Sequence, residues 1–170
     1  MGEVKTSVAS PVAGPPRAFD SLEQEAYLQL WRTYDRLREI EEAMFQRHGV
    51  TAQQYNALRV LRSARPGTLP TSAIGGRLVS RAPDMTRLLD RLEQQGLVRR
   101  ERSKASRRVV EVAITAAGMA LLSRIAADVR RCGREQLGHL DDRTLRVLIA
   151  ALKRAREPHE AEADAWPGND

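Results

Sequence analysis

The stretch TSAIGGRLVSRAPDMTRLLDRLEQQGLVRRERSKASRRVVEVAIT, from Thr71 to Thr115, decides the fold. Pro83 keeps Ala82 out of the helical region and is itself tolerated in a first helical turn, so Ser80 to Pro83 separates two helices. Leu78 belongs to the apolar side of the first helix. In the second helix the apolar residues recur at i, i+3, i+4 and i+7, which indicates one buried face. These residues are Met85, Leu88, Leu89 and Leu92.

A basic hairpin follows the second helix. Gly96 is predicted to end that helix as its C′ residue, where glycine is favoured. Leu97–Arg102 and Val109–Ile114 are predicted as two strands, because apolar residues alternate along the second of them. Thr68 and Leu69 are candidates for a short third strand. The order predicts a winged helix-turn-helix, whose second helix enters the major groove of DNA. The alternative is a small helical domain with a solvated charged face and an unrelated hairpin.

The charge of the chain is concentrated in this stretch. Ten Lys and Arg residues and four Asp and Glu residues lie between Arg77 and Arg108, a difference of six, and the net charge of the whole chain is also +6. A local basic patch predicts binding to a polyanion through release of counterions. A surface that serves only solubility, the alternative, would spread its charge more evenly.

Three segments resemble successive signatures of the MarR (multiple antibiotic resistance regulator) family. They are GVTAQQYNALRVL (49–61), APDMTRLLDRLEQQGLVRRERS (82–103) and RRVVEVAITAAG (107–118). The resemblance covers roughly Leu22 to Arg156 and implies a homodimeric transcription regulator. Relatives usually carry an acidic residue just before the paired wing arginines, where it helps to orient the wing. This chain has Ser106 there.

The expected fold is mainly α with a small β-wing: a winged helix-turn-helix plus a helical dimerisation region from both chain ends. Residues 1–18, rich in Pro, Gly and Ala, are expected to form a disordered arm. Residues 19–156 are expected to form the MarR-like domain, with dimerisation helices in 19–49 and 115–156 and the winged helix-turn-helix in 50–114. Residues 157–170 are expected to be a flexible tail.

The helices carry recognisable end signals. Asp20 or Ser21 is the expected N-cap of a long first helix, and Thr51 with Gln54 forms a capping box for the next. Thr71 or Ser72, then Thr115, then Asp141 or Asp142 are the later N-caps. Pro66–Gly67 is expected to stop the second helix. Gly75–Gly76 is unusual within a helix: close packing against the second helix of the motif is one explanation, and fraying is the other.

The long helices have apolar faces that need partners. The first helix has a stripe of about six turns, which only a partner helix could cover. Its residues are Tyr27, Leu30, Trp31, Tyr34, Leu37, Ile40, Met44 and Phe45. The helix after Thr115 has a face of Leu121, Leu122, Ile125, Val129, Cys132 and Gln136. The last helix is expected to turn Leu145, Leu148, Ile149 and Leu152 inward.

The DNA-binding residues are assigned by their place in the motif. Thr86, Arg87 and Arg91 are expected to face base edges, with Asp84 nearby. Arg107 and Arg108 are expected to serve the wing. Phosphate contacts are assigned to Ser72, Arg77, Arg102 and Lys104. Asp90 has a second interpretation, suggested by the resemblance, as the partner of a wing arginine.

Three further features carry open alternatives. His48, beside Gly49 at a helix end, is expected to complement the helix dipole, and a ligand contact is the alternative. Cys132 on an apolar helical face indicates a buried packing residue rather than a redox sensor. Family members bind aromatic effectors between the dimer arms and the winged domain. An effector pocket is therefore assigned to Tyr27, Trp31 and Tyr34, with core packing as the alternative for Trp31.

No catalytic constellation, metal-ligand spacing or cofactor motif occurs in the sequence, so an enzyme is the least favoured class. One cysteine, no signal-peptide core and no apolar run of membrane length indicate the reducing cytoplasm. The preferred function is a repressor that binds a palindromic operator and responds to a small aromatic or phenolic effector. The alternative is a winged-helix module that uses its basic face on an acidic protein partner.

Overall fold

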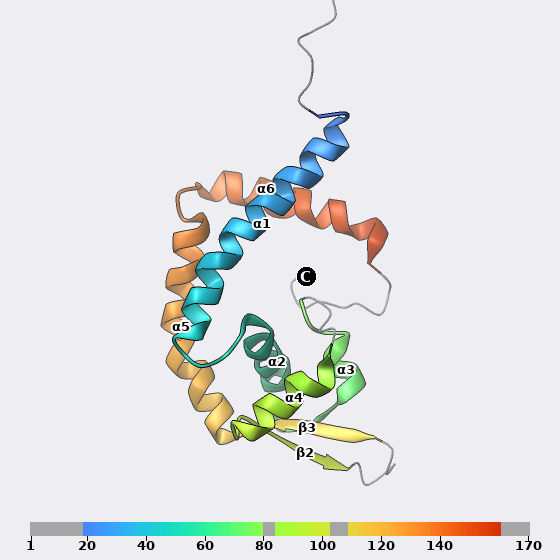
Figure 1. Ribbon diagram of the computed structural model, residues 1–170, viewed down its shortest axis with the longest axis vertical. Helices are drawn as coiled ribbons and strands as arrows, with labels where there is room; N and C mark the ends of the chain where they lie inside the picture. Colours follow the sequence, from blue (N-terminus) through green and yellow to red (C-terminus); the bar gives the residue numbers. More distant parts are fainter. Residues whose placement is uncertain (1–18, 80–83, 103–108, 161–170) are drawn as a thin grey trace, which may run out of the picture. The chain divides into compact units, whose positions relative to one another are not determined.

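The computed structural model describes residues 19–79, 84–102 and 109–160 (Figure 1). In chain order the elements are α1 (Leu22–Gln46), α2 (Ala52–Ser63), β1 (Leu69–Pro70), α3 (Thr71–Gly75), α4 (Met85–Gln94), β2 (Val98–Arg102), β3 (Val110–Ile114), α5 (Ala116–Leu137), α6 (Asp142–Arg156) and the 3-10 helix η1 (Glu157–His159). The expectation of a mainly helical fold with a small β-wing is confirmed. The chain divides into two compact units, residues 1–37 and 38–170.

The first unit contributes the first part of α1. Ser21 Oγ accepts a hydrogen bond from the backbone N–H of Gln24 at 3.1 Å, which caps the helix as predicted. The side-chain oxygen of Gln24 accepts in turn from the backbone N–H of Asp20 at 2.8 Å. Four residues of the predicted apolar stripe are exposed in this unit: Tyr27, Leu30, Trp31 and Tyr34.

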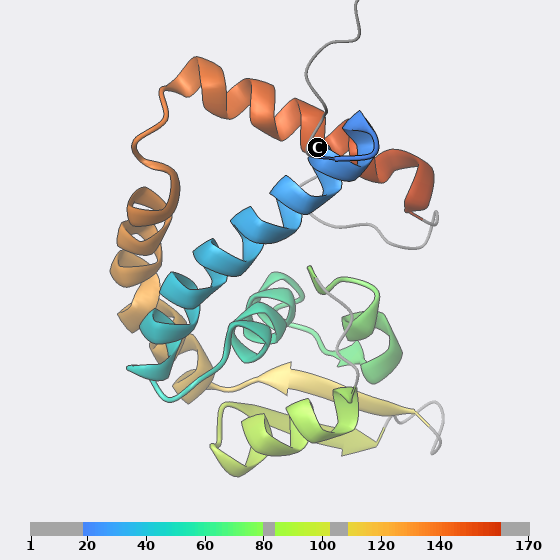
Figure 2. The same ribbon diagram turned by 45° about the horizontal axis from the view of Figure 1, so that its top comes forward.

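In the second unit a three-stranded antiparallel sheet has the order β1-β3-β2. Val98 pairs with Ile114 and Arg102 with Val110, so β2 and β3 form the predicted hairpin. Leu69 pairs with Val112 at the edge, which confirms the short third strand one residue later than expected. Figures 1 and 2 both show α4 lying along this hairpin, with α2 and α3 beside β3.

The core of this unit lies between the sheet and the helices α2, α4 and α5. Its largest fully buried side chains are Phe45, Leu58, Leu61, Ile74, Leu89, Leu92, Ile125 and Val112. The predicted capping box is present: Thr51 Oγ1 accepts from the backbone N–H of Gln54 at 3.2 Å, and Gln54 Oε1 accepts from that of Thr51 at 2.9 Å. Thr115 caps α5 and Asp141 caps α6, also as predicted.

The first helix of the motif differs from its prediction. α3 ends at Gly75, with Gly76 as the C-cap, so Leu78 is buried in the turn that follows. Neither Thr71 nor Ser72 caps it, because the N-cap is Pro70, which has no side-chain hydrogen bond. The Thr71 hydroxyl instead donates to the carbonyl of Val110 at 3.3 Å. A Cβ at Gly75 would lie 3.8 Å from Met85 Cε, an ordinary contact, so packing against α4 does not require a glycine at this position.

α6 has no buried residue. Leu145, Leu148 and Leu152 are half-buried and Ile149 is exposed, so the inward orientation expected for these four is not reached within one chain. Beyond Arg156 the chain continues as η1, whose residues belong to the expected flexible tail. Among the described residues, no helix is both long and apolar enough to cross a membrane.

Candidate nucleic-acid interface

α4 presents a polar face outward because its apolar stripe is buried. Leu88, Leu89 and Leu92 are buried, as predicted, whereas Thr86, Arg87 and Arg91 are exposed. At a period of 3.6 residues per turn, burial of one stripe leaves the residues between its members on the opposite side. The side chains assigned to base edges therefore share a solvent-facing helix.

Asp84 begins this helix. Its Oδ1 accepts a hydrogen bond from the backbone N–H of Arg87 at 2.9 Å, which makes it the N-cap of α4. Its Oδ2 lies 3.5 Å from Nε of Arg87, and the Arg87 side chain is 78% exposed. Asp84, expected only to lie near the bases, therefore caps the helix and also pairs with the side chain of Arg87.

The residues assigned to phosphates lie on several elements. Ser72 on α3 and Arg77 in the following turn are exposed, as is Arg102 at the end of β2. Lys104, Ser106, Arg107 and Arg108 lie outside the described residues. The phosphate and wing assignments therefore stay predictions.

Arg100, which the sequence assignment missed, joins the hairpin to α4. Its Nε lies 2.8 Å from Oε2 of Glu93, and its Nη2 lies 2.6 Å from both Glu93 Oε2 and Asp90 Oδ1. Its backbone N–H also donates to Glu93 Oε1 at 3.1 Å. The hydrogen bond from Arg100 lowers the pKa of Glu93 below its ordinary value, and the bond to Glu93 is the main cause that raises the pKa of Arg100. The partner of Asp90 is thus an arginine of strand β2.

A signal for Arg100 is present in the sequence. Alternate residues of a strand point to the same side, so Arg100 shares its face with Val98, which is buried. An arginine on a buried face needs an acidic partner. Asp90 and Glu93, three residues apart on one side of the preceding helix, provide two.

His48 has a side-chain partner that the sequence did not indicate. It follows Gln46, the last residue of α1, and its Nε2 lies 2.8 Å from Oδ2 of Asp128 on α5. The hydrogen bond from His48 is the main cause that lowers the pKa of Asp128, and the charge of Arg131 adds to it. Arg131 Nη2 lies 2.8 Å from the other oxygen of Asp128. The imidazole thus bonds to a carboxylate 80 residues away in sequence, and the expected helix-dipole role stays a prediction.

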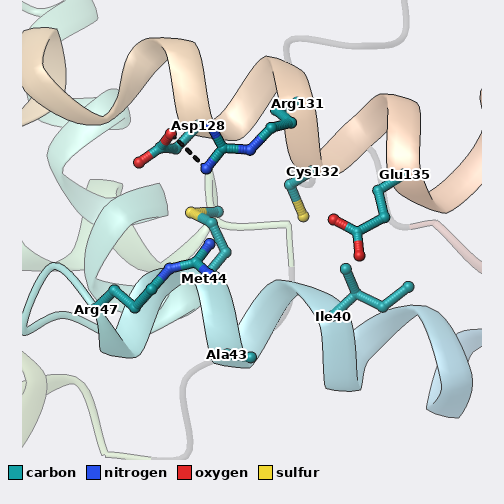
Figure 3. A pocket seen from close by; sticks show the side chains of 8 residues that line it. All are labelled: Ile40, Ala43, Met44, Arg47, Asp128, Arg131, Cys132 and Glu135. Atoms are coloured by element: carbon teal, nitrogen blue, oxygen red, sulfur yellow. Dashed lines mark ion pairs between the residues drawn. The ribbon is translucent and has the colours of Figure 1, made fainter.

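Cys132 is buried beside a small hollow between α1 and α5, whose volume is about 120 Å³ (Figure 3). Burial is the first cause that raises the pKa of its thiol, and the charges of Glu41 and Glu135 raise it further. Both effects disfavour the thiolate, which is the reactive form of cysteine. The structure agrees with the predicted packing role. Among the described residues, no three His, Cys, Asp or Glu side chains are grouped so that they could hold a metal ion.

The side chains assigned to an effector pocket lie on the first part of α1. Tyr27, Trp31 and Tyr34 are each more than half exposed, and the rings of Tyr27 and Trp31 have their centroids 6.1 Å apart. Trp31 is therefore not packed in the core of the single chain. The pocket itself stays a prediction.

Comparisons with known proteins place the chain among transcription regulators of the MarR family. The family model described as "MarR family" matches residues 50–110. A crystal structure of a MarR transcription factor from Planctomyces limnophilus is 54% identical, with 79% of this chain and 98% of that chain covered and a TM-score of 0.64. The HTH-type transcriptional repressor MdtR of Bacillus subtilis (strain 168) is 28% identical over 149 residues, which are 87% of this chain and 93% of that protein.

The fold also matches that of a regulator bound to DNA. Sco3205 of Streptomyces coelicolor, a MarR family transcriptional regulator solved in complex with DNA, is 19% identical and has a TM-score of 0.74. The match covers 91% of this chain and 98% of that one. At this identity the likeness concerns the fold alone.

Proposed function

Because the chain belongs to the MarR family of transcription regulators, we propose that it is a repressor that binds a palindromic DNA operator as a homodimer. The observation that carries the proposal is the outward face of α4, the recognition helix, where Thr86, Arg87 and Arg91 are exposed on a helix whose other side is buried. Bidentate arginine contacts to guanine are the commonest specific contacts in a major groove.

Exposed apolar side chains on the terminal helices support the pairing of two chains. In this proposal residues 50–114 read DNA, and the helices of 19–49 and 115–156 pair the two chains. α6 exposes Val147 and Ile149, which are 63% and 53% accessible in the single chain. In the first unit, α1 exposes four large apolar side chains of its own stripe. Apolar surface of this kind is normally covered by a partner. Two recognition helices would then meet half-sites about one helical turn apart.

The effector we propose is a small aromatic or phenolic compound. Exposed aromatic rings on α1, at Tyr27, Trp31 and Tyr34, are suited to stacking against such a molecule. A ligand releases the operator only if it binds the DNA-incompetent arrangement more tightly, with a coupling of about 1–3 kcal/mol. In this proposal the regulator acts on DNA in the cytoplasm and performs no catalysis, because its relatives are transcription regulators.

The test is a binding titration at several salt concentrations, on a duplex selected from a random pool by the protein itself. Arg87→Ala is expected to weaken binding to the selected duplex by about 1–3 kcal/mol and to relax its specificity. Lys104→Ala is expected to weaken all sequences about equally and to flatten the salt slope by roughly one unit.

Equal losses on selected and random DNA for Arg87→Ala would contradict base reading. If no duplex is enriched and the basic face instead binds an acidic protein, the interaction-module alternative holds.

A further inference from the structure

The turn that joins α1 to α2 is held firmly on both sides. The backbone N–H groups of His48 and Gly49 donate to the carbonyls of Phe45 and Gln46 at 2.9 and 3.0 Å. Gly49 has a φ of +70°, a conformation that glycine adopts without strain, and the Thr51 capping box begins two residues later. Val50 between them is buried. The turn is therefore a fixed point from which other elements can be positioned.

Two side chains from distant elements attach to adjacent residues of this turn. Gln95, the C-cap of the recognition helix, donates from its Nε2 to the carbonyl of Gly49 at 3.1 Å. His48, the preceding residue, bonds to Asp128 of α5 at 2.8 Å. Asp128 is itself held from its other oxygen by Arg131. The end of α4 is thus connected, through two residues of the turn, to the middle of α5.

The end of α4 is also connected to the beginning of α5. The Thr115 hydroxyl donates to the carbonyl of Gly96, immediately after the recognition helix, at 2.7 Å. A Cβ at Gly118, in the first turn of α5, would overlap the carbonyl of Leu97, so the two segments are packed as closely as a glycine allows. From Thr115 to Asp128, at 1.5 Å per residue, is about 20 Å along the helix axis.

We propose that His48 and Gln95 are positioning residues for operator binding, which hold the end of the recognition helix on α5 through the turn at Gly49. The buried leucines of α4 and the bonds from Arg100 hold this helix against the core and the hairpin, and Thr115 holds the residue after it. Gln95 and His48 add a further attachment at the C-terminal end of α4, through Gly49 and Asp128. Neither side chain needs to touch DNA to act in this way. The proposal rests on the proposed operator binding, because a fixed recognition helix matters most where side chains must meet particular base edges.

The first arm of the test uses the full-length protein without DNA. Amide hydrogen exchange is measured at Gln95, Gly96 and Leu97 in the parent, Gln95→Ala, His48→Ala and His48→Gln. Loss of one hydrogen bond predicts exchange about two- to tenfold faster in the two alanine variants. His48→Gln keeps a side-chain N–H that can reach Asp128, so it is expected to exchange like the parent. Unchanged exchange in both alanine variants would overturn the proposal.

The second arm measures affinity for the selected duplex and for random DNA at fixed salt. Gln95→Ala and His48→Ala are expected to lower the ratio of the two affinities about two- to tenfold, with binding to random DNA unchanged. In the double variant this ratio is expected to fall no further than in the single variant with the larger effect, because both residues belong to one attachment. Gln53→Ala, an exposed glutamine on α2, is the matched control.

Each outcome has a distinct meaning. The positioning role would be overturned if the two single losses in specificity add fully in the double variant. It would also be overturned if the ratio of affinities for selected and random DNA is no lower in Gln95→Ala and His48→Ala than in Gln53→Ala. The melting temperature of Gln95→Ala is expected to match that of Gln53→Ala, since both side chains are exposed. A parent protein that prefers no duplex would contradict operator binding itself. The hydrogen-exchange measurements would still decide whether His48 and Gln95 hold the end of α4.

Discussion

Arg100 on β2 and Glu93 on α4 are joined by three hydrogen bonds, from the backbone N–H, Nε and Nη2 of the arginine, at 3.1, 2.8 and 2.6 Å. The wing strand and the recognition helix are therefore fixed to each other by one partly buried side chain, 25% exposed. The next residue back, Arg99, points to the other side of the strand and forms an ion pair with Glu101, where it is 53% exposed. These neighbouring arginines form a natural comparison.

Arg100→Ala is expected to lower the free energy of unfolding by about 1–3 kcal/mol, because it leaves Glu93 and Asp90 without their shared partner. Arg99→Ala removes only an exposed ion pair and is expected to change the free energy of unfolding by less than about 1 kcal/mol. Denaturant titrations of the two variants measure both values. Equal effects would show that Arg100 adds nothing beyond a surface charge.

The bond to Arg100 makes part of the stability depend on pH. The pKa of Glu93 is lowered from 4.5 in the folded protein, so the unfolded chain binds more protons in this range and stability rises with pH there. The contribution is fully present above pH 4.5 and is lost as pH falls through the folded pKa. The free energy of unfolding of the parent and of Glu93→Gln should therefore be measured from neutral pH downward. The difference between the two values should shrink as the solution becomes acidic. In a protein that already carries Arg100→Ala, Glu93→Gln should not change the pH dependence of the free energy of unfolding. A change that persists there would show that the pH dependence does not come from the bond between Glu93 and Arg100.

Asp84 allows its capping role to be separated from its charge. Asp84→Ala is expected to cost about 0.5–2 kcal/mol of stability, because the N–H of Arg87 loses its acceptor. Asp84→Asn keeps an acceptor oxygen, so its stability should stay near that of the parent, whereas removing a negative charge from the DNA-facing end of α4 should tighten binding to random DNA. Thermal melts and DNA titrations of both variants test this. An asparagine variant as unstable as the alanine variant would mean that the charge, and not the hydrogen bond, stabilises the helix.

Cys132 is expected to be chemically quiet. Burial raises the pKa of its thiol, so the native protein should react with a disulfide reagent at neutral pH far more slowly than the unfolded chain. Peroxide should not release the protein from DNA, and Cys132→Ser should behave like the parent. Release of the parent by peroxide, absent in Cys132→Ser, would establish a redox sensor instead.

The exposed apolar face of α6 is expected to hold the homodimer. Ile149→Glu places a charge on the side of α6 that also carries Leu145, Leu148 and Leu152, so it should give a monomer by light scattering and abolish binding to the selected duplex. Arg154→Ala, an exposed change on the same helix, should leave the dimer intact. A glutamate variant that remains dimeric would move the interface to another surface.

The sequence alone was sufficient for the helical segments and most of their ends. The stripe of α4, the N-cap at Ser21, the capping box at Thr51, and the caps at Thr115 and Asp141 were all predicted, because these signals act between residues three or four positions apart. The hairpin was predicted from alternation within its second strand and from the polar turn between the two strands, which are also local signals. The roles of Thr86, Arg87 and Arg91 on DNA follow from their place on this helix and stay predictions.

The tertiary structure decided which distant side chains meet. Gln95 reaches Gly49 across 46 residues and His48 reaches Asp128 across 80, and no local pattern marks either pair. Thr71 does not cap α3, because its hydroxyl donates a hydrogen bond to the carbonyl of Val110 on β3. α3 also ends earlier than predicted, at Gly75, a boundary that its local sequence did not define. Contacts of this kind depend on how complete helices and strands pack together, and that packing is a property of the whole core rather than of any segment within it.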